Sequence, residues 1–198
     1  PSAALGSCRH KITQDECGRL VEIFRKYSIR YYFYIGGNDS ADTSSKVSRA
    51  ARAAGYDLRV IAVPKTIDND LAVTDHSPGY GSVARWLAMS VRDAGLDTEA
   101  IGVVDTVKII EVMGRNAGWI TAATALARDH EDAAPHLIYL PERPFDEKRF
   151  LADVKAVYDR LGYVVITVCE GLKDESGAYI TASSRAIDTD RFGHRQLG

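Results

Sequence analysis

The sequence has few cysteines and no excess of charge of one sign. Its three cysteines, Cys8, Cys17 and Cys169, are odd in number and form no C-x-x-C pair, which argues against a disulfide framework or a zinc site. A reducing, cytoplasmic setting is therefore expected. The 25 basic and 27 acidic residues give a formal net charge of −2, so no basic excess points to nucleic acid or an anionic membrane.

Long apolar runs and several common motifs are also missing. The apolar run at 163–169 is far shorter than the roughly 18 residues of a membrane-spanning helix, so no membrane partner is expected. No G-x-x-x-x-G-K-[ST] segment occurs, which argues against a P-loop kinase. The start, Pro1-Ser2-Ala3-Ala4, lacks Met and an apolar signal segment, so a processed, trimmed or partial product is expected.

What is present is an alternation of short apolar runs with helical patterns. This alternation predicts an α/β protein with Rossmann-like, three-layer domains and mainly parallel sheets. Strands are expected at 31–35, 58–63, 107–112, 136–140 and 163–168, and helices at 15–27, 44–54, 82–94, 116–127 and 146–161. The polar loop 68–81 is the expected domain boundary.

Ligands of open α/β sheets bind beyond the carboxyl ends of the strands. Five polar or glycine-rich segments follow predicted strands, at 36–40, 64–70, 113–116, 141–143 and 170–172. In the first, Gly36-Gly37-Asn38-Asp39-Ser40, glycine lets the backbone approach a ligand, and backbone N–H groups before a helix can hold phosphate. The alternative is a strand-to-helix turn with an Asn, Asp or Ser cap.

The second segment, Pro64 to Asp70, brings a cation and two carboxylates onto one loop. Lys65 could neutralise phosphate charge, one of Asp68 and Asp70 could take a proton from a hydroxyl, and the other could serve a magnesium ion. Phosphoryl transfer needs this combination. The alternative is a solvated turn stabilised by Asp and Asn side chains.

Two further segments could bind an anionic sugar. Arg115 of Met113-Gly114-Arg115 could hold an anion with two hydrogen bonds, and Glu170 could bind sugar hydroxyls. The alternatives are a surface arginine at a helix start and a plain charge at a strand end. The segment 79–84 fits G-x-G-x-x-A, but it follows 74–78 rather than a strand, which argues against a dinucleotide site.

Taken together and in this order, these segments resemble the phosphofructokinase family from about residue 31 to 198. The resemblance implies that Asp68 is the general base for the 1-hydroxyl of fructose 6-phosphate and that Asp70 maintains the catalytic geometry. It also implies that Thr66 binds the substrate or the transferring phosphate. The residues implied to bind fructose 6-phosphate are Met113, Gly114, Arg115 and Glu170.

The resemblance assigns the phosphoryl donor to Gly37, Asn38, Asp39 and Ser40. ATP-dependent members usually have glycine at the positions of Asp39 and Lys65. Asp39 should oppose the inner phosphate of ATP by bulk and charge, and Lys65, a catalytic residue, could neutralise pyrophosphate instead. The expected enzyme is thus a pyrophosphate-dependent phosphotransferase that makes fructose 1,6-bisphosphate reversibly, in glycolysis. The alternatives are an ATP-dependent 6-phosphofructokinase and a non-catalytic sugar-phosphate-binding subunit or fragment.

The resemblance further implies a Mg²⁺ cofactor, with Asn38 and Asp39 as candidate metal positions, and a homo-oligomer, either a dimer or a tetramer. Residues 1–78 would belong to the donor-binding domain and 79–198 to the fructose 6-phosphate domain. Some positions depart from the family. Asn38 replaces a frequent aspartate, Thr106 and Leu197 replace arginines, and the N-terminal G-G-x-x-P-G-x-N segment is absent, so a fragment is expected.

Overall fold

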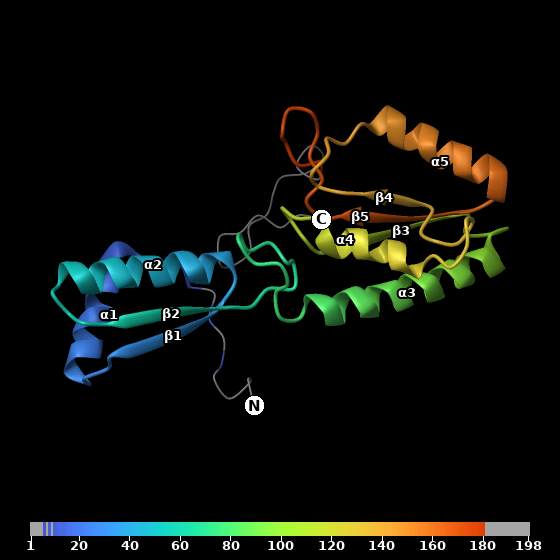
Figure 1. The fold of residues 1–198 in the computed structure, drawn as a ribbon. Helices are drawn as coiled ribbons and strands as arrows, with labels where there is room; N and C mark the ends of the chain where they lie inside the picture. The colour runs from blue at the N-terminus through green and yellow to red at the C-terminus, as the bar shows by residue number, and fades with distance from the viewer. Residues whose placement is uncertain (1–5, 7, 9, 181–198) are drawn as a thin grey trace. The chain divides into compact units, whose positions relative to one another are not determined.

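The structure is a computed structural model that describes residues 6, 8 and 10–180. Two compact units divide between Thr66 and Ile67 (Figure 1). This division falls just before the polar loop 68–81. The assignment of donor and sugar-phosphate binding to separate domains stays a prediction.

The first unit is a two-stranded parallel sheet with two helices. Strand β1 pairs with β2 in a register that sets Tyr31 opposite Arg59 and Gly36 opposite Pro64. The two strands therefore end side by side, which brings the segments that follow them together. The elements are α1 (Gln14–Lys26), β1 (Tyr31–Gly36), α2 (Asn38–Ala53) and β2 (Arg59–Pro64).

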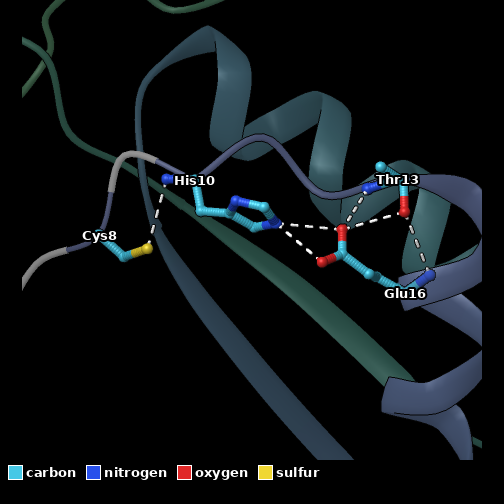
Figure 2. A network of polar contacts seen from close by, with 4 residues as sticks. All are labelled: Cys8, His10, Thr13 and Glu16. Atoms are coloured by element: carbon cyan, nitrogen blue, oxygen red, sulfur yellow. Dashed lines mark hydrogen bonds and ion pairs between the residues drawn. The ribbon is translucent and has the colours of Figure 1, made fainter. Parts of the chain in front are cut away.

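The start of α1 is fixed by a capping box, which Figure 2 shows from close by. The Thr13 side chain accepts from the backbone N–H of Glu16, and the Glu16 carboxylate accepts from the backbone N–H of Thr13 at 2.8 Å. His10 Nε2 lies 2.9 Å from the same carboxylate. The Thr13 backbone contact, followed by the His10 contact, lowers the pKa of Glu16 to about 2.

The core of the first unit lies where both helices face the sheet. Helical spacing places apolar residues of α1 and α2 on one side of each helix, and these pack with Tyr56. The Tyr56 hydroxyl donates to the carbonyls of Phe24 and Ile29, so this buried polar group is satisfied. The buried cluster consists of Cys17, Val21, Phe24, Val47, Ala51 and Tyr56.

The second unit has a parallel sheet in the order β3-β5-β4, with β5 in the middle. In Figure 1, α5 lies on one side of this sheet and α3 and α4 lie on the other, which makes three layers. Residues 164–167 of β5 are fully buried, as expected for a central parallel strand. The elements are α3 (Tyr80–Ile101), β3 (Val107–Val112), α4 (Trp119–Ala123), η2 (Thr124–Ala127), β4 (Leu137–Tyr139), α5 (Glu147–Leu161) and β5 (Val164–Cys169).

The α/β fold with parallel sheets is confirmed, but three predicted helices have wrong boundaries. Helix α2 begins at Asn38 rather than 44, because Asn38, Asp39 and Ser40 form its first turn. Helix α3 extends from Tyr80 to Ile101 rather than 82–94, because it continues through Gly95. The predicted helix 116–127 is α4 followed by a 3-10 turn.

Gly95 is a packing residue rather than a helix end. A Cβ added at Gly95 would lie 2.5 Å from the Cβ of Ala134. The absence of a side chain therefore lets the segment that precedes β4 pack directly on the helix backbone. Within the described part of the chain, no helix combines the length and the apolar character that crossing a membrane requires.

Candidate active site

The predicted donor segment connects β1 to α2. Gly37 is the N-cap residue of α2, and Asn38, Asp39 and Ser40 follow as its first helical residues. The N-terminus of a 16-residue helix carries partial positive charge and backbone N–H groups, both of which suit an anionic ligand. A Cβ at Gly36 would overlap the Ser40 side chain, so glycine is needed for this tight connection.

Asp39 lies on the surface at the start of this helix. Its side chain is 80% exposed, and one carboxylate oxygen lies 3.7 Å from the Lys11 Nζ. A pair this exposed contributes little to stability. The carboxylate is therefore available to a ligand that approaches the helix N-terminus.

Lys65 and Thr66 lie beside the donor segment. The Lys65 backbone N–H donates to the Gly36 carbonyl at 2.9 Å, which continues the pairing of β1 with β2 by one residue. A Cβ at Gly37 would lie 3.6 Å from the Lys65 carbonyl oxygen and 3.7 Å from the Thr66 Cβ. The first unit thus brings together six predicted residues, Gly37, Asn38, Asp39, Ser40, Lys65 and Thr66.

The next residue, Ile67, belongs to the second unit. Ile67 packs against a buried cluster of Leu87, Val112 and Ile120. The loop that carries Asp68 is therefore attached to the core of the second unit by an apolar side chain. Sequence reasoning missed this residue, although a lone isoleucine within a polar loop is a usable signal of such an anchor.

Asn69 is a second residue that sequence reasoning missed. It is buried between Asp68 and Asp70 and has a left-handed backbone with φ of 55°. Its Oδ1 accepts from the Ser77 N–H at 2.7 Å, and its Nδ2 donates to the Asp75 carbonyl at 3.3 Å. Asparagine tolerates this conformation better than most residues. Asn69 thereby shapes the loop that presents both aspartates, each half-buried.

The predicted sugar-phosphate segment follows β3 and lies against the end of β5. Gly114 N–H donates to the Glu170 Oε1 at 3.2 Å, so these two predicted residues are in contact. Met113 is 57% exposed, whereas Arg115 is half-buried. Among the described residues, the buried Nε of Arg115 has no hydrogen-bond partner. A buried donor without a partner costs free energy, which sets Arg115 apart among the predicted residues.

Glu142, in the segment after β4, has a structural role. Its Oε1 accepts from the backbone N–H of Gly118 at 2.6 Å, immediately before α4. A Cβ at Gly118 would lie 2.6 Å from the other carboxylate oxygen. The segment after β4 therefore stabilises the loop before α4 through Glu142.

A metal ion would have few protein ligands here. Within the described ranges, no group of three or more His, Cys, Asp or Glu side chains is arranged to hold a metal. Magnesium usually takes one or two carboxylates and completes its shell with water and substrate phosphates. The exposed carboxylate of Asp39 and the amide oxygen of Asn38, both at the start of α2, fit that pattern of hard oxygen ligands.

One position that departs from the family, Leu197, lies outside the described residues. The dinucleotide pattern at 79–84 begins at the N-cap of α3 and has no strand before it, as its sequence context indicates. Lys108, two residues after Thr106, donates to the Asp97 carboxylate at 2.7 Å.

Comparison with known proteins adds independent information. The family model described as "Phosphofructokinase" matches residues 1–198. Proteins named pyrophosphate--fructose 6-phosphate 1-phosphotransferase from Xanthomonas campestris and Halomonas elongata are 50% and 48% identical over the whole chain. The chain spans 48% of the length of each. A crystal structure of pyrophosphate-dependent phosphofructokinase from Marinobacter aquaeolei is 48% identical and superposes with a TM-score of 0.78, covering 87% of this chain and 43% of that one.

Proposed function

Because this chain belongs to the phosphofructokinase family, we propose that it takes part in phosphoryl transfer from pyrophosphate to the 1-hydroxyl of fructose 6-phosphate. The products would be phosphate and fructose 1,6-bisphosphate, in a reversible reaction of glycolysis. The observation that carries the proposal is the loop from Lys65 to Asp70. This loop is tied by backbone pairing to Gly36 at one end and anchored by Ile67 and Asn69 at the other.

Four residues of this loop have chemical tasks in the proposed reaction. Asp68 accepts the proton of the attacking hydroxyl, which raises the nucleophilicity of the oxygen as it approaches phosphorus. Lys65 neutralises charge on the transferring phosphoryl group, and Thr66 binds that group or the substrate. Asp70 maintains the geometry around the base. Arg115 binds the fructose 6-phosphate anion through its guanidinium.

Pyrophosphate is favoured as donor by two positions and by the names of the relatives. Asp39 lies at the helix N-terminus where a donor phosphate would bind, and its exposed carboxylate would repel an additional nucleotide phosphate. Lys65 supplies a positive charge that a glycine would not. Magnesium, held by Asp39, Asn38 and the substrate, would neutralise pyrophosphate charge.

Two accompanying proposals concern the setting of the enzyme. A cytoplasmic location is supported by the free state of Cys8, Cys17 and Cys169. A homo-oligomer, dimer or tetramer, is supported by large apolar side chains exposed on the second unit, including Trp86 at 64% and Trp119 at 54%.

The test is a coupled assay for fructose 1,6-bisphosphate with the natural full-length protein, magnesium and fructose 6-phosphate. Pyrophosphate and ATP are offered in parallel reactions. Product with pyrophosphate and none with ATP is expected. Product with ATP alone would contradict the roles given to Asp39 and Lys65. Absence of product with both donors, alongside binding of fructose 6-phosphate, would favour a non-catalytic sugar-phosphate-binding protein.

A further inference from the structure

Gly114, in the proposed sugar-phosphate segment, is hydrogen-bonded through both of its backbone polar groups. Its N–H donates to the Glu170 carboxylate at 3.2 Å. Its carbonyl accepts from the Cys169 thiol at 2.7 Å. Cys169 and Glu170 are consecutive residues, so the last residue of β5 and the residue after it contact both backbone polar groups of Gly114.

The sheet explains why these groups meet. Val112 at the end of β3 is paired with Cys169 at the end of β5, and the Glu170 N–H donates to the Val112 carbonyl at 2.9 Å. The segments that follow β3 and β5 then leave the sheet together. A Cβ at Gly171 would overlap the carbonyl of Arg115, so the approach is as close as a backbone without a side chain allows.

The Gly114 carbonyl also accepts from the Ala117 N–H at 3.3 Å, and Gly114 has an unusual backbone conformation. Its φ of 121° lies in a region that residues with a side chain rarely adopt, and a Cβ there would overlap the Ala117 carbonyl. The N–H and the carbonyl of Gly114 belong to the two peptide groups that join it to Met113 and Arg115, so their orientation sets the directions in which those two residues leave the backbone. A group that fixes the Gly114 backbone therefore also constrains the backbone of Arg115, from which the guanidinium extends.

We propose that Cys169 is a positioning residue for fructose 6-phosphate, since its thiol fixes the Gly114 carbonyl and thereby holds Met113 and Arg115 in their binding orientation. The proposal rests on the proposed function. In this role the buried Cys169 thiol acts through Gly114 and does not itself contact the substrate. Affinity for the sugar phosphate should depend on this thiol, whereas affinity for pyrophosphate should not.

The surroundings of Cys169 suit a hydrogen-bond donor rather than a nucleophile. The side chain is 2% exposed. Burial, the main cause, raises the pKa of the thiol, so it stays protonated and keeps its hydrogen for the Gly114 carbonyl. A reactive cysteine would need the opposite surroundings, with a lowered pKa and access to solvent.

The experiment compares Cys169→Ala, which removes the donor, with Cys169→Ser, which retains one. Cys17→Ala is the matched control, because Cys17 is also a fully buried free thiol but belongs to the core of the first unit. Fructose 6-phosphate affinity is measured by calorimetry on the natural full-length protein without any phosphoryl donor. The KM for pyrophosphate is measured separately at saturating fructose 6-phosphate.

The expected result is a roughly two- to tenfold weaker binding of fructose 6-phosphate in Cys169→Ala, the range of one lost hydrogen bond. Cys169→Ser should recover most of the affinity for fructose 6-phosphate. In Cys169→Ala the KM for pyrophosphate should change by less than about twofold, which is less than the effect of one lost hydrogen bond. Cys17→Ala should lower thermal stability without weakening fructose 6-phosphate binding.

Three outcomes would overturn the proposal. These are unchanged fructose 6-phosphate affinity in folded Cys169→Ala, no recovery in Cys169→Ser, or an equal weakening in Cys17→Ala. Failure of the proposed function looks different, because the unmodified protein itself would then form no product with pyrophosphate. If the unmodified protein binds no fructose 6-phosphate, the positioning role for this substrate is also excluded.

Discussion

The side chain of Asn69 hydrogen-bonds the backbone N–H of Ser77, with Oδ1 and N separated by 2.7 Å. Ser77 is fully buried, and Asn69 is 6% exposed. The bond joins residues eight positions apart in the chain, and Asp68 and Asp70 flank the asparagine. Because both aspartates have proposed catalytic tasks, the shape of this loop and the rate of reaction should respond together to changes at Asn69.

Replacing Asn69 with Ala should destabilise the protein by about 1 to 3 kcal/mol, since the Ser77 N–H would be left buried without its partner. It should also lower kcat. Asn69→Gly loses the same hydrogen bonds but relieves the left-handed backbone, so it should be the more stable variant by about 1 kcal/mol. Urea unfolding and steady-state kinetics measure both effects. Equal stability of the two variants would contradict the role of the backbone conformation.

The double change Asp39→Gly with Lys65→Gly should shift donor preference from pyrophosphate towards ATP. The change removes the Asp39 carboxylate, which would repel a nucleotide phosphate, and the Lys65 cation, which would neutralise pyrophosphate. The measurement is the ratio of kcat/KM for the two donors. Asp42→Gly on the same helix is a matched control, because Asp42 pairs with Lys46 and has no proposed donor contact. An unchanged ratio in the double variant would remove the argument for donor choice.

Asp68→Asn should reduce kcat by at least about 100-fold, because an amide cannot accept the proton of the attacking hydroxyl. Fructose 6-phosphate affinity should remain within about threefold, since Asp68 acts on the transition state rather than on ground-state binding. Single-turnover kinetics and calorimetry separate the two quantities. Turnover near the unmodified rate would show that another group is the base.

Gly95 and Gly18 should respond to alanine with opposite signs. Gly95→Ala gains about 1 kcal/mol of helix propensity but overpacks the contact with Ala134, which costs roughly 1 to 3 kcal/mol. The net result should be destabilisation by about 1 kcal/mol. Gly18 lies in α1 with open space around it, so Gly18→Ala should stabilise by about 0.5 to 1 kcal/mol. Thermal or urea unfolding distinguishes them, and stabilisation by both would refute the packing role of Gly95.

His136 should make stability depend on pH. The Val165 N–H donates to its Nδ1 at 2.8 Å, and burial, the main cause, lowers the pKa of the imidazole from its ordinary 6.5. The folded state therefore prefers the neutral ring. Its contribution should be fully present above about pH 6.5 and be lost as the pH falls below that value through the folded pKa.

The measurement is the free energy of unfolding from pH 8 to pH 5, for the unmodified protein and for His136→Asn. The asparagine oxygen can accept from the same backbone N–H but does not titrate in this range. The unmodified protein should lose more stability on acidification than the variant. Parallel curves would exclude His136 as the cause.

Much of the fold was predictable because it depends on local pattern. Apolar runs of about six residues between helical patterns sufficed to predict parallel strands, and the strands at 31–35 and 107–112 lie within one residue of their observed bounds. The boundaries of α2 and α3 were less predictable, since Asn38 and Gly95 favour a cap or a helix end unless tertiary contacts decide otherwise. The segments that follow the strands were identified from the same pattern.

Local sequence pattern sufficed to predict the α/β class, and it identified the residues that the proposal assigns to phosphoryl transfer and their order after the strands. The contacts that those residues make depend on the tertiary fold. Gly114 contacts Cys169 and Glu170, which lie 55 and 56 positions further along the sequence. Glu142 instead hydrogen-bonds Gly118 and stabilises a loop. The reason is that hydrogen bonds of 3 Å depend on strand register and close backbone approach, which no local pattern of residues specifies.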